Sequence, residues 1–237
     1  MKNADVTESD SRAEPVPQQT QPIAQLRWFE HLEADVEHGH EDGEVAGGWT
    51  ASEFLEGEPA PAGRWASLMA VGRAFHEALR EVPRPDLLDR RNHPWAVADR
   101  VAWADAAPSL PGEAGRALAA LLELRGPVEA PDQLIHGDLT GNVLFHPGQR
   151  PAVIDFSPYW RPARYAEAIV TADALLYHGA GPELAGGGED VPLLVRALIF
   201  RLVALCILTG RDGALPEGEP ARFAGVTALV RTRAGER

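Results

Sequence analysis

The stretch Leu134–Phe156, LIHGDLTGNVLFHPGQRPAVIDF, combines short apolar runs with a polar segment. The runs NVLF and AVIDF are separated by HPGQ, and two apolar runs joined by a Pro-Gly turn predict a β-hairpin. Asp138 lies between Gly137 and Gly141 just before the hairpin, Asn142 begins the first run, and Asp155 lies near the hairpin's end. We therefore predict that the hairpin brings these three side chains together.

These side chains are the kinds that phosphoryl transfer from a nucleotide requires. The reaction needs a carboxylate that orients the acceptor hydroxyl and Mg²⁺ that neutralises the phosphates. Asp138 is placed for the first role. Asn142 and Asp155 are placed for the second, because Mg²⁺ prefers oxygen ligands and phosphates complete its shell. A purely structural interpretation stays open, since Asp and Asn are also common turn formers.

Composition limits the functional classes. The 237 residues are 45% hydrophobic, which is enough for a sizeable core. Residues 1–60 hold 14 acidic and three basic residues, so most of the net charge of −13 lies there. This distribution argues against nucleic acid or an anionic membrane as a partner. The lone Cys206 cannot form an intrachain disulfide, and we identify no signal peptide or membrane span, so we expect a cytoplasmic protein.

The chain divides into three segments by its patterns. Residues 1–22 are polar and contain three prolines, which predicts a disordered tail. Residues 23–57 hold one helix-like pattern and the strand-like WTASEFLEG. From residue 58 onward the pattern is mostly helical, with a strand in QLI before the polar loop. Helices are expected at residues 64–80, 93–103, 112–125, 163–178, 191–210 and 220–232.

HGDLTGNVLF followed by AVIDF resembles the catalytic and metal-binding segments of the aminoglycoside phosphotransferase and choline kinase-like superfamily. The segments HPWAVADRVAW and IDFSPYWRPARYAEAIVTADAL are similar to an actinobacterial branch of it. The resemblance implies an α+β, protein-kinase-like fold. Its mostly helical C-terminal lobe would span residues 58–237, with a catalytic loop at 136–142 and a metal-binding hairpin extending to 156. A reduced N-terminal lobe would span residues 23–57.

The same resemblance implies roles for the loop and hairpin residues. Asp138 would be the catalytic base, and Asn142 and Asp155 would be Mg²⁺ ligands. His136 and Gly137 would support the loop. ATP would be the co-substrate, and the acceptor would be a small molecule.

Two further sites are predicted outside the loop. By the resemblance, Glu53, Phe54 and Leu55 in SEFLEG form the hinge that touches adenine. Arg161 follows the hairpin closely enough to contact substrate or phosphate near Asp155, although a surface role at the start of a helix is equally consistent with its position.

The sequence departs from the superfamily pattern in two places. Asn142 follows Asp138 by four residues, where the superfamily has five. The glycine-rich loop and the strand lysine that hold the phosphates in this fold do not precede the predicted hinge, and the one lysine is Lys2.

Two functions are therefore weighed. The first is an ATP-dependent phosphotransferase that transfers the γ-phosphate to a hydroxyl of a small molecule. The second is a catalytically inactive kinase-like binding or regulatory protein, or a truncated gene product that lacks the nucleotide-binding loop and lysine. The loop residues favour the first, and the front of the chain favours the second.

Overall fold

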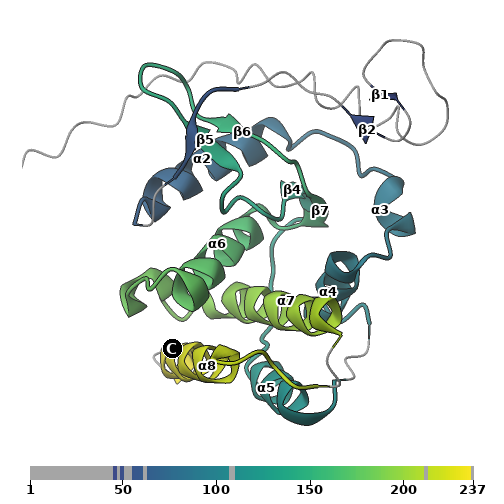
Figure 1. Cartoon of the computed structure of the whole chain (residues 1–237), viewed down its shortest axis with the longest axis vertical. Helices are drawn as coiled ribbons and strands as arrows, with labels where there is room; N and C mark the ends of the chain where they lie inside the picture. The colour runs from purple at the N-terminus through teal and green to yellow at the C-terminus, as the bar shows by residue number, and fades with distance from the viewer. Residues whose placement is uncertain are drawn as a thin grey trace, which may run out of the picture.

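The computed structural model describes residues 45–46, 49–50, 55–60, 63–106, 110–210 and 213–235. The predicted tail, the helix expected after residue 23 and the hinge residues Glu53 and Phe54 lie outside these ranges. The described part consists of helices and small antiparallel sheets (Figure 1), which fits the expected α+β, kinase-like fold.

The element bounds follow the chain from front to back. The helices are α2 Trp65–Ala78, α3 Leu87–Arg90, α4 Pro94–Ala102, α5 Gly112–Leu122, α6 Ala163–Tyr177, the 3₁₀ helix η1 Pro182–Ala185, α7 Val191–Thr209 and α8 Glu219–Gly235. The strands are β1 Val45–Ala46, β2 Trp49–Thr50, β3 Glu58–Pro59, β4 Gln133–His136, β5 Val143–Phe145, β6 Ala152–Val153 and β7 Pro158–Arg161. The six helices predicted from periodicity are confirmed within a few residues at each end. The short α3 was not predicted.

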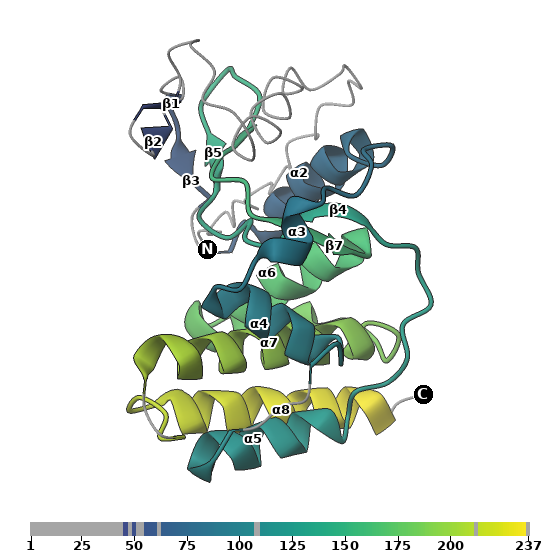
Figure 2. The same ribbon diagram turned by 90° about the vertical axis from the view of Figure 1, so that its right-hand side faces the viewer.

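Helix α7 is the centre of the core. It is apolar on nearly every side, and almost all of its residues are buried. Helices α4 and α6 pack against it, and α5 and α8 lie side by side beyond it in both views (Figures 1 and 2). Among the described residues it is the one helix long and apolar enough to cross a membrane, with a mean hydropathy of 2.4. Because 83% of that window is buried inside the protein, α7 is better explained as a core helix.

The predicted hairpin is confirmed. Strands β5 and β6 are antiparallel neighbours, with Val143 opposite Val153 and Leu144 opposite Ala152. Strand β3 pairs with the other side of β5. The strand expected over residues 49–57 was wrong in extent. Strand β2 covers Trp49–Thr50, and residues 55–57 have no regular structure before β3 begins at Glu58.

A second sheet was not predicted. No strand was predicted for the segment SPYWRP, which precedes the helix expected at residues 163–178. It instead contains β7, which pairs with β4 from Gln133 opposite Arg161 to His136 opposite Pro158. Pro158 is the first residue of the strand, a position that a proline can occupy in a sheet. The pairing lays the Tyr159 ring directly over Gly137.

Replacement of Gly137 by alanine should destabilise the protein. A Cβ at residue 137 would lie 2.3 Å from the Tyr159 ring, and both residues are buried. Overpacking of this kind costs about 1–3 kcal/mol of unfolding free energy. We expect Gly137→Ala to lower the denaturant midpoint measured by circular dichroism.

Gly225→Ala provides the matched control. Gly225 lies within α8, and a Cβ there would meet no atom within 4 Å. Alanine is the better helix former by up to about 1 kcal/mol, so this variant should be as stable as the parent or more so. Equal midpoints for the two variants would contradict the close packing of Tyr159 on Gly137.

Candidate active site

A tight turn closes the loop that carries Asp138. The backbone N–H of Asn142 donates to the carbonyl of Leu139 at 3.0 Å, and Gly141 has φ +84°. A positive φ at the third residue of a four-residue turn is typical of a type II turn and favours glycine there. The turn explains how the loop closes although Asn142 follows Asp138 by only four residues.

The side chain of Asn142 folds back on Asp138. Its Nδ2 donates to the Asp138 carbonyl at 2.7 Å and lies 3.4 Å from the carboxylate oxygen Oδ2. Because the amide nitrogen is used in this way, the amide oxygen Oδ1 is left to accept a ligand. The backbone carbonyl of Asn142 accepts from the Ile154 N–H at 3.0 Å, which ties the loop to the residue just before Asp155.

Asp155 has an unusual backbone. Its φ is +48°, and its side chain is exposed after the end of β6. Aspartate tolerates the left-handed region better than most residues, although the conformation still has a cost. Such conformations are concentrated at functional sites, so the strain at Asp155 agrees with a ligand-binding role.

The donors present suit Mg²⁺. The amide oxygen of Asn142 and the carboxylate of Asp155 are hard oxygen ligands on adjoining segments. Among the described residues, no group of three or more His, Cys, Asp or Glu side chains could hold a metal by itself. Mg²⁺ commonly binds one or two protein oxygens and completes its shell with water and substrate phosphates. The residues therefore fit an ion that arrives together with a nucleotide.

His136 holds the loop and the hairpin in place. Its Nδ1 accepts from the backbone N–H of Asp138 at 3.1 Å and of Ser157 at 3.5 Å. Since Nδ1 accepts, the proton of the neutral ring lies on Nε2, which donates to the Ile154 carbonyl at 3.1 Å. The side chain is completely buried. These contacts tie the loop to the hairpin, and the supporting role of His136 in catalysis stays a prediction.

His76 is a second buried histidine that the sequence did not single out. It lies on the buried face of α2, and its Nε2 accepts from the backbone N–H of His136 at 3.1 Å. Burial, and to a lesser extent the neighbouring His136, lower the pKa of His76 to about 3. Burial also lowers the pKa of His136. Both rings are therefore neutral near pH 7, as their accepting nitrogens require.

Asp138 lies between the hairpin and the helical core. Its Oδ2 faces Asn142, and its Oδ1 accepts from Nη2 of Arg201 on α7 at 3.0 Å. Arg201 also donates to both oxygens of Asp173 on α6, at 2.6 and 2.5 Å. The Asp138 side chain is 42% exposed, so this pairing leaves it accessible. Sequence reasoning missed Arg201 and Asp173; the available signal for Arg201 was that it is one of two arginines within an otherwise apolar helix.

Attraction by two carboxylates keeps Arg201 charged. Burial alone would lower its pKa, but the fields of Asp173 and Asp138 outweigh burial and raise the pKa above its ordinary value. The guanidinium also lies over the rings of Trp95 and Phe200. A fixed positive charge at this place holds Asp138 in one orientation.

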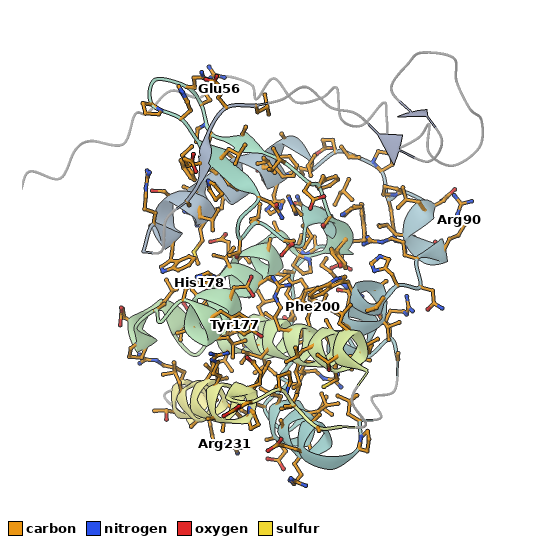
Figure 3. All side chains as sticks on the ribbon, in the orientation of Figure 1. Glu56, Arg90, Tyr177, His178, Phe200 and Arg231 are labelled. Carbon is orange, nitrogen blue, oxygen red and sulfur yellow. The ribbon has the colours of Figure 1, made fainter. Side chains whose placement is uncertain are left out.

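A pocket of about 300 Å³ opens beside this ion-pair network. Arg201 and Thr140 form its inner wall, and Thr140 is the second residue after Asp138. Tyr177 and His178 belong to the lining and lie at the end of α6 (Figure 3). The complete lining is Trp95, Thr140, Asp173, Tyr177, His178, Arg201, Leu205 and Leu208. Asp138 itself does not line the pocket and is linked to it through Arg201.

The structure does not test the ligand contacts predicted for Arg161 and Leu55. Arg161 binds Asp99 through Nε and Nη2, binds Asp105 through Nη2 at 2.7 Å, and stacks over Trp103. These contacts give Arg161 a structural role, and its contact with substrate or phosphate stays a prediction. Leu55 is half-buried just before Gly57 and β3, and its adenine contact likewise stays a prediction.

A mixed helical fold with a loop aspartate, a loop asparagine and a hairpin aspartate defines the class of kinase-like phosphotransferases. The chain belongs to the phosphotransferase enzyme family, whose model matches residues 10–191. The match includes the whole loop and hairpin and begins within the segment predicted as a tail. Kinases of this family generally use ATP and Mg²⁺. No curated protein and no solved structure gives a significant match to the chain.

The two buried histidines should make stability depend on pH. A histidine whose pKa is lower in the folded state than in the unfolded state binds its proton more tightly once unfolded. Its stabilising effect is therefore complete above the unfolded pKa of about 6.5 and is lost as the pH falls toward about 3. We expect the unfolding free energy to fall between pH 6.5 and 4, by up to about 1.4 kcal/mol per pH unit for His76.

Denaturant titrations at several pH values test this expectation. His76→Gln keeps an acceptor for the His136 N–H but does not titrate, so its stability should depend less steeply on pH. Part of the pH dependence of stability that remains in this variant comes from His136. His178→Gln removes an exposed histidine and should keep the parental slope. Parallel pH profiles for His76→Gln and the parent would refute the assignment.

Proposed function

We propose that the protein is an ATP-dependent small-molecule kinase that transfers the γ-phosphate to a hydroxyl group. The observation that carries the proposal is the position of Asp138. One oxygen of its carboxylate faces Asn142 on the hairpin side, and the other faces the pocket through Arg201. A carboxylate between a metal-binding loop and a pocket is placed to orient an acceptor toward a nucleotide phosphate.

In the proposed reaction, the protein mainly positions the reactants. Asp138 accepts a hydrogen bond from the acceptor hydroxyl and takes up its proton as the new bond to phosphorus forms. Arg201 fixes the carboxylate, so the hydroxyl meets it in one orientation. Asn142 and Asp155 would hold Mg²⁺, which neutralises charge on the phosphates when it is bound. His136 keeps Asp138 and the hairpin in register through its ring nitrogens.

The nucleotide would approach from the hairpin side. We place adenine near the predicted hinge residues Glu53, Phe54 and Leu55. We also propose a cytoplasmic protein whose acceptor is a free small molecule, because the front of the chain is acidic and repels nucleic acid and anionic lipid.

A second candidate function is a kinase-like binding protein that does not turn over ATP. One observation favours it: the Asp138 carboxylate is held in an ion pair with the buried Arg201, a contact that a purely structural residue would also make. Under this alternative, Asp138 would have a structural role. Nucleotide binding and hydrolysis separate the two candidates.

Calorimetry with Mg-ATP and an ATPase assay with water as the acceptor test the proposal. We expect Asp138→Asn to lower the hydrolysis rate by about 10²-fold or more, because the group that orients the nucleophile is lost. Nucleotide affinity should change little. Asp155→Asn should instead weaken binding of the nucleotide in the presence of Mg²⁺.

Asp105→Asn is the matched control for these variants. Asp105 is a half-exposed carboxylate that pairs with Arg161, so its loss should leave both readouts unchanged. Equal ATPase rates for the parent and Asp138→Asn would overturn the role of Asp138. No detectable binding at millimolar Mg-ATP would favour the non-catalytic candidate.

A further inference from the structure

The pocket is continuous with the proposed catalytic loop. Thr140 belongs to that loop, and Arg201 contacts Asp138 directly while lining the pocket. A volume of about 300 Å³ is at the small end of the range for small-molecule sites. Asp138 is not itself a lining residue, and its link to the pocket is the contact with Arg201.

The charges in the pocket wall cancel. Asp173 is the one carboxylate among the lining residues, and it is only 5% exposed. Arg201 donates to both of its oxygens. Within the lining, the pair therefore leaves no unpaired charge of either sign, and Asp138, the third member of the ion-pair network, lies outside the lining. An ammonium group placed here would lose its hydration without gaining a counter-ion, which is costly.

The rest of the wall is largely apolar, and the apolar surface continues outside the pocket. Trp95, Leu205 and Leu208 contribute their side chains to the wall, together with the Tyr177 ring. Tyr177 is 43% and Leu208 55% exposed, and they are two of the three large hydrophobic side chains that are exposed among the described residues. The third, Ile207, precedes Leu208 at the end of α7. Exposed apolar side chains that gather at a pocket mark a surface that binds apolar ligands.

The inner wall holds an unused polar group. The Thr140 hydroxyl is buried and makes no hydrogen bond with the described part of the chain. Arg201 uses Nε and Nη2 for its two carboxylates, and its Nη1 bonds no described residue. A buried hydroxyl without a partner is unfavourable, so a ligand oxygen that met it would bind more tightly. Thr140 and Arg201 thus provide polar recognition in a wall that is otherwise largely apolar.

We propose that this pocket selects a small uncharged alcohol with an aromatic or aliphatic body, and that this alcohol is the phosphoryl acceptor. The acceptor role rests on the proposed kinase function, whereas the ligand class rests on the pocket alone. In the reaction, the alcohol's O–H bond breaks and its proton passes to Asp138. Its oxygen bonds to the γ-phosphorus as the bond to the β,γ-bridging oxygen breaks. The products are a phosphate monoester and ADP, and Asp138 returns the proton to water.

Two probes that differ by one charge test the ligand class. Phenylpropanol is a neutral primary alcohol. Phenylalaninol has the same skeleton with one added amino group, which is protonated at neutral pH. Binding of each to the full chain is measured by calorimetry without nucleotide. We expect phenylpropanol to bind at least about tenfold more tightly, because the ammonium is desolvated without a partner.

Two neighbouring substitutions supply the matched control. Leu208→Asp places a carboxylate at the pocket, at a residue exposed enough to tolerate it. It should weaken phenylpropanol binding and reduce the preference between the probes to less than about threefold. Ile207→Asp adds the same charge to the same helical turn at a residue that does not line the pocket. It should keep the parental preference.

The outcomes separate this proposal from the kinase function. Tighter binding of phenylalaninol to the parent, or equal effects of Leu208→Asp and Ile207→Asp, would overturn the ligand class. Mass spectrometry of phenylpropanol incubated with Mg-ATP and the protein tests the acceptor role by detecting the phosphate ester. Selective binding without ester would overturn that role but leave the ligand class supported. Failure of Mg-ATP itself to bind would be a failure of the proposed function.

Discussion

The buried guanidinium of Arg201 constrains the rest of the site. It projects from the most apolar helix of the protein, where an unpaired charge would be very costly. Arg201 donates two hydrogen bonds to the carboxylate of Asp173 on the neighbouring helix α6. One further hydrogen bond from Arg201 goes to Asp138. The packing of α6 on α7 is therefore linked to the orientation of the loop carboxylate. A core that must satisfy one positive charge fixes the position of the proposed base.

A second constraint comes from the opposite side of the loop. His136 uses both ring nitrogens on backbone groups of the loop and hairpin, and its own backbone N–H is bonded by His76. Burial keeps both rings neutral, so each nitrogen has one defined role as donor or acceptor. Asp138 is thus held from one side by hydrogen bonds to neutral groups and from the other by a charge. This arrangement fixes the loop while leaving the carboxylate accessible.

Local patterns predicted much of this architecture. The hairpin followed from two apolar runs and a Pro-Gly turn, and the long helices followed from their periodicity. Strand β7 was missed because it has four residues flanked by prolines, and its pairing with β4 depends on tertiary contacts. Arg201 and His76 were missed for a related reason. His76 lies in an ordinary helical pattern and Arg201 in an almost wholly apolar one, and only the folded chain shows what each side chain meets. The family was recognisable from Asp138, Asn142 and Asp155, because that chemistry is local in sequence.

The ion pair between Asp138 and Arg201 joins residues 63 positions apart, and the contact between His136 and His76 joins residues 60 apart. During synthesis, the loop leaves the ribosome well before its partner on α7 is made. Until that helix is complete, Asp138 and Asp173 are two carboxylates without their shared cation, and they repel each other. The loop therefore has its ion-pair partner only once α7 packs between α4 and α6. The proposed active site is in this sense a product of core assembly.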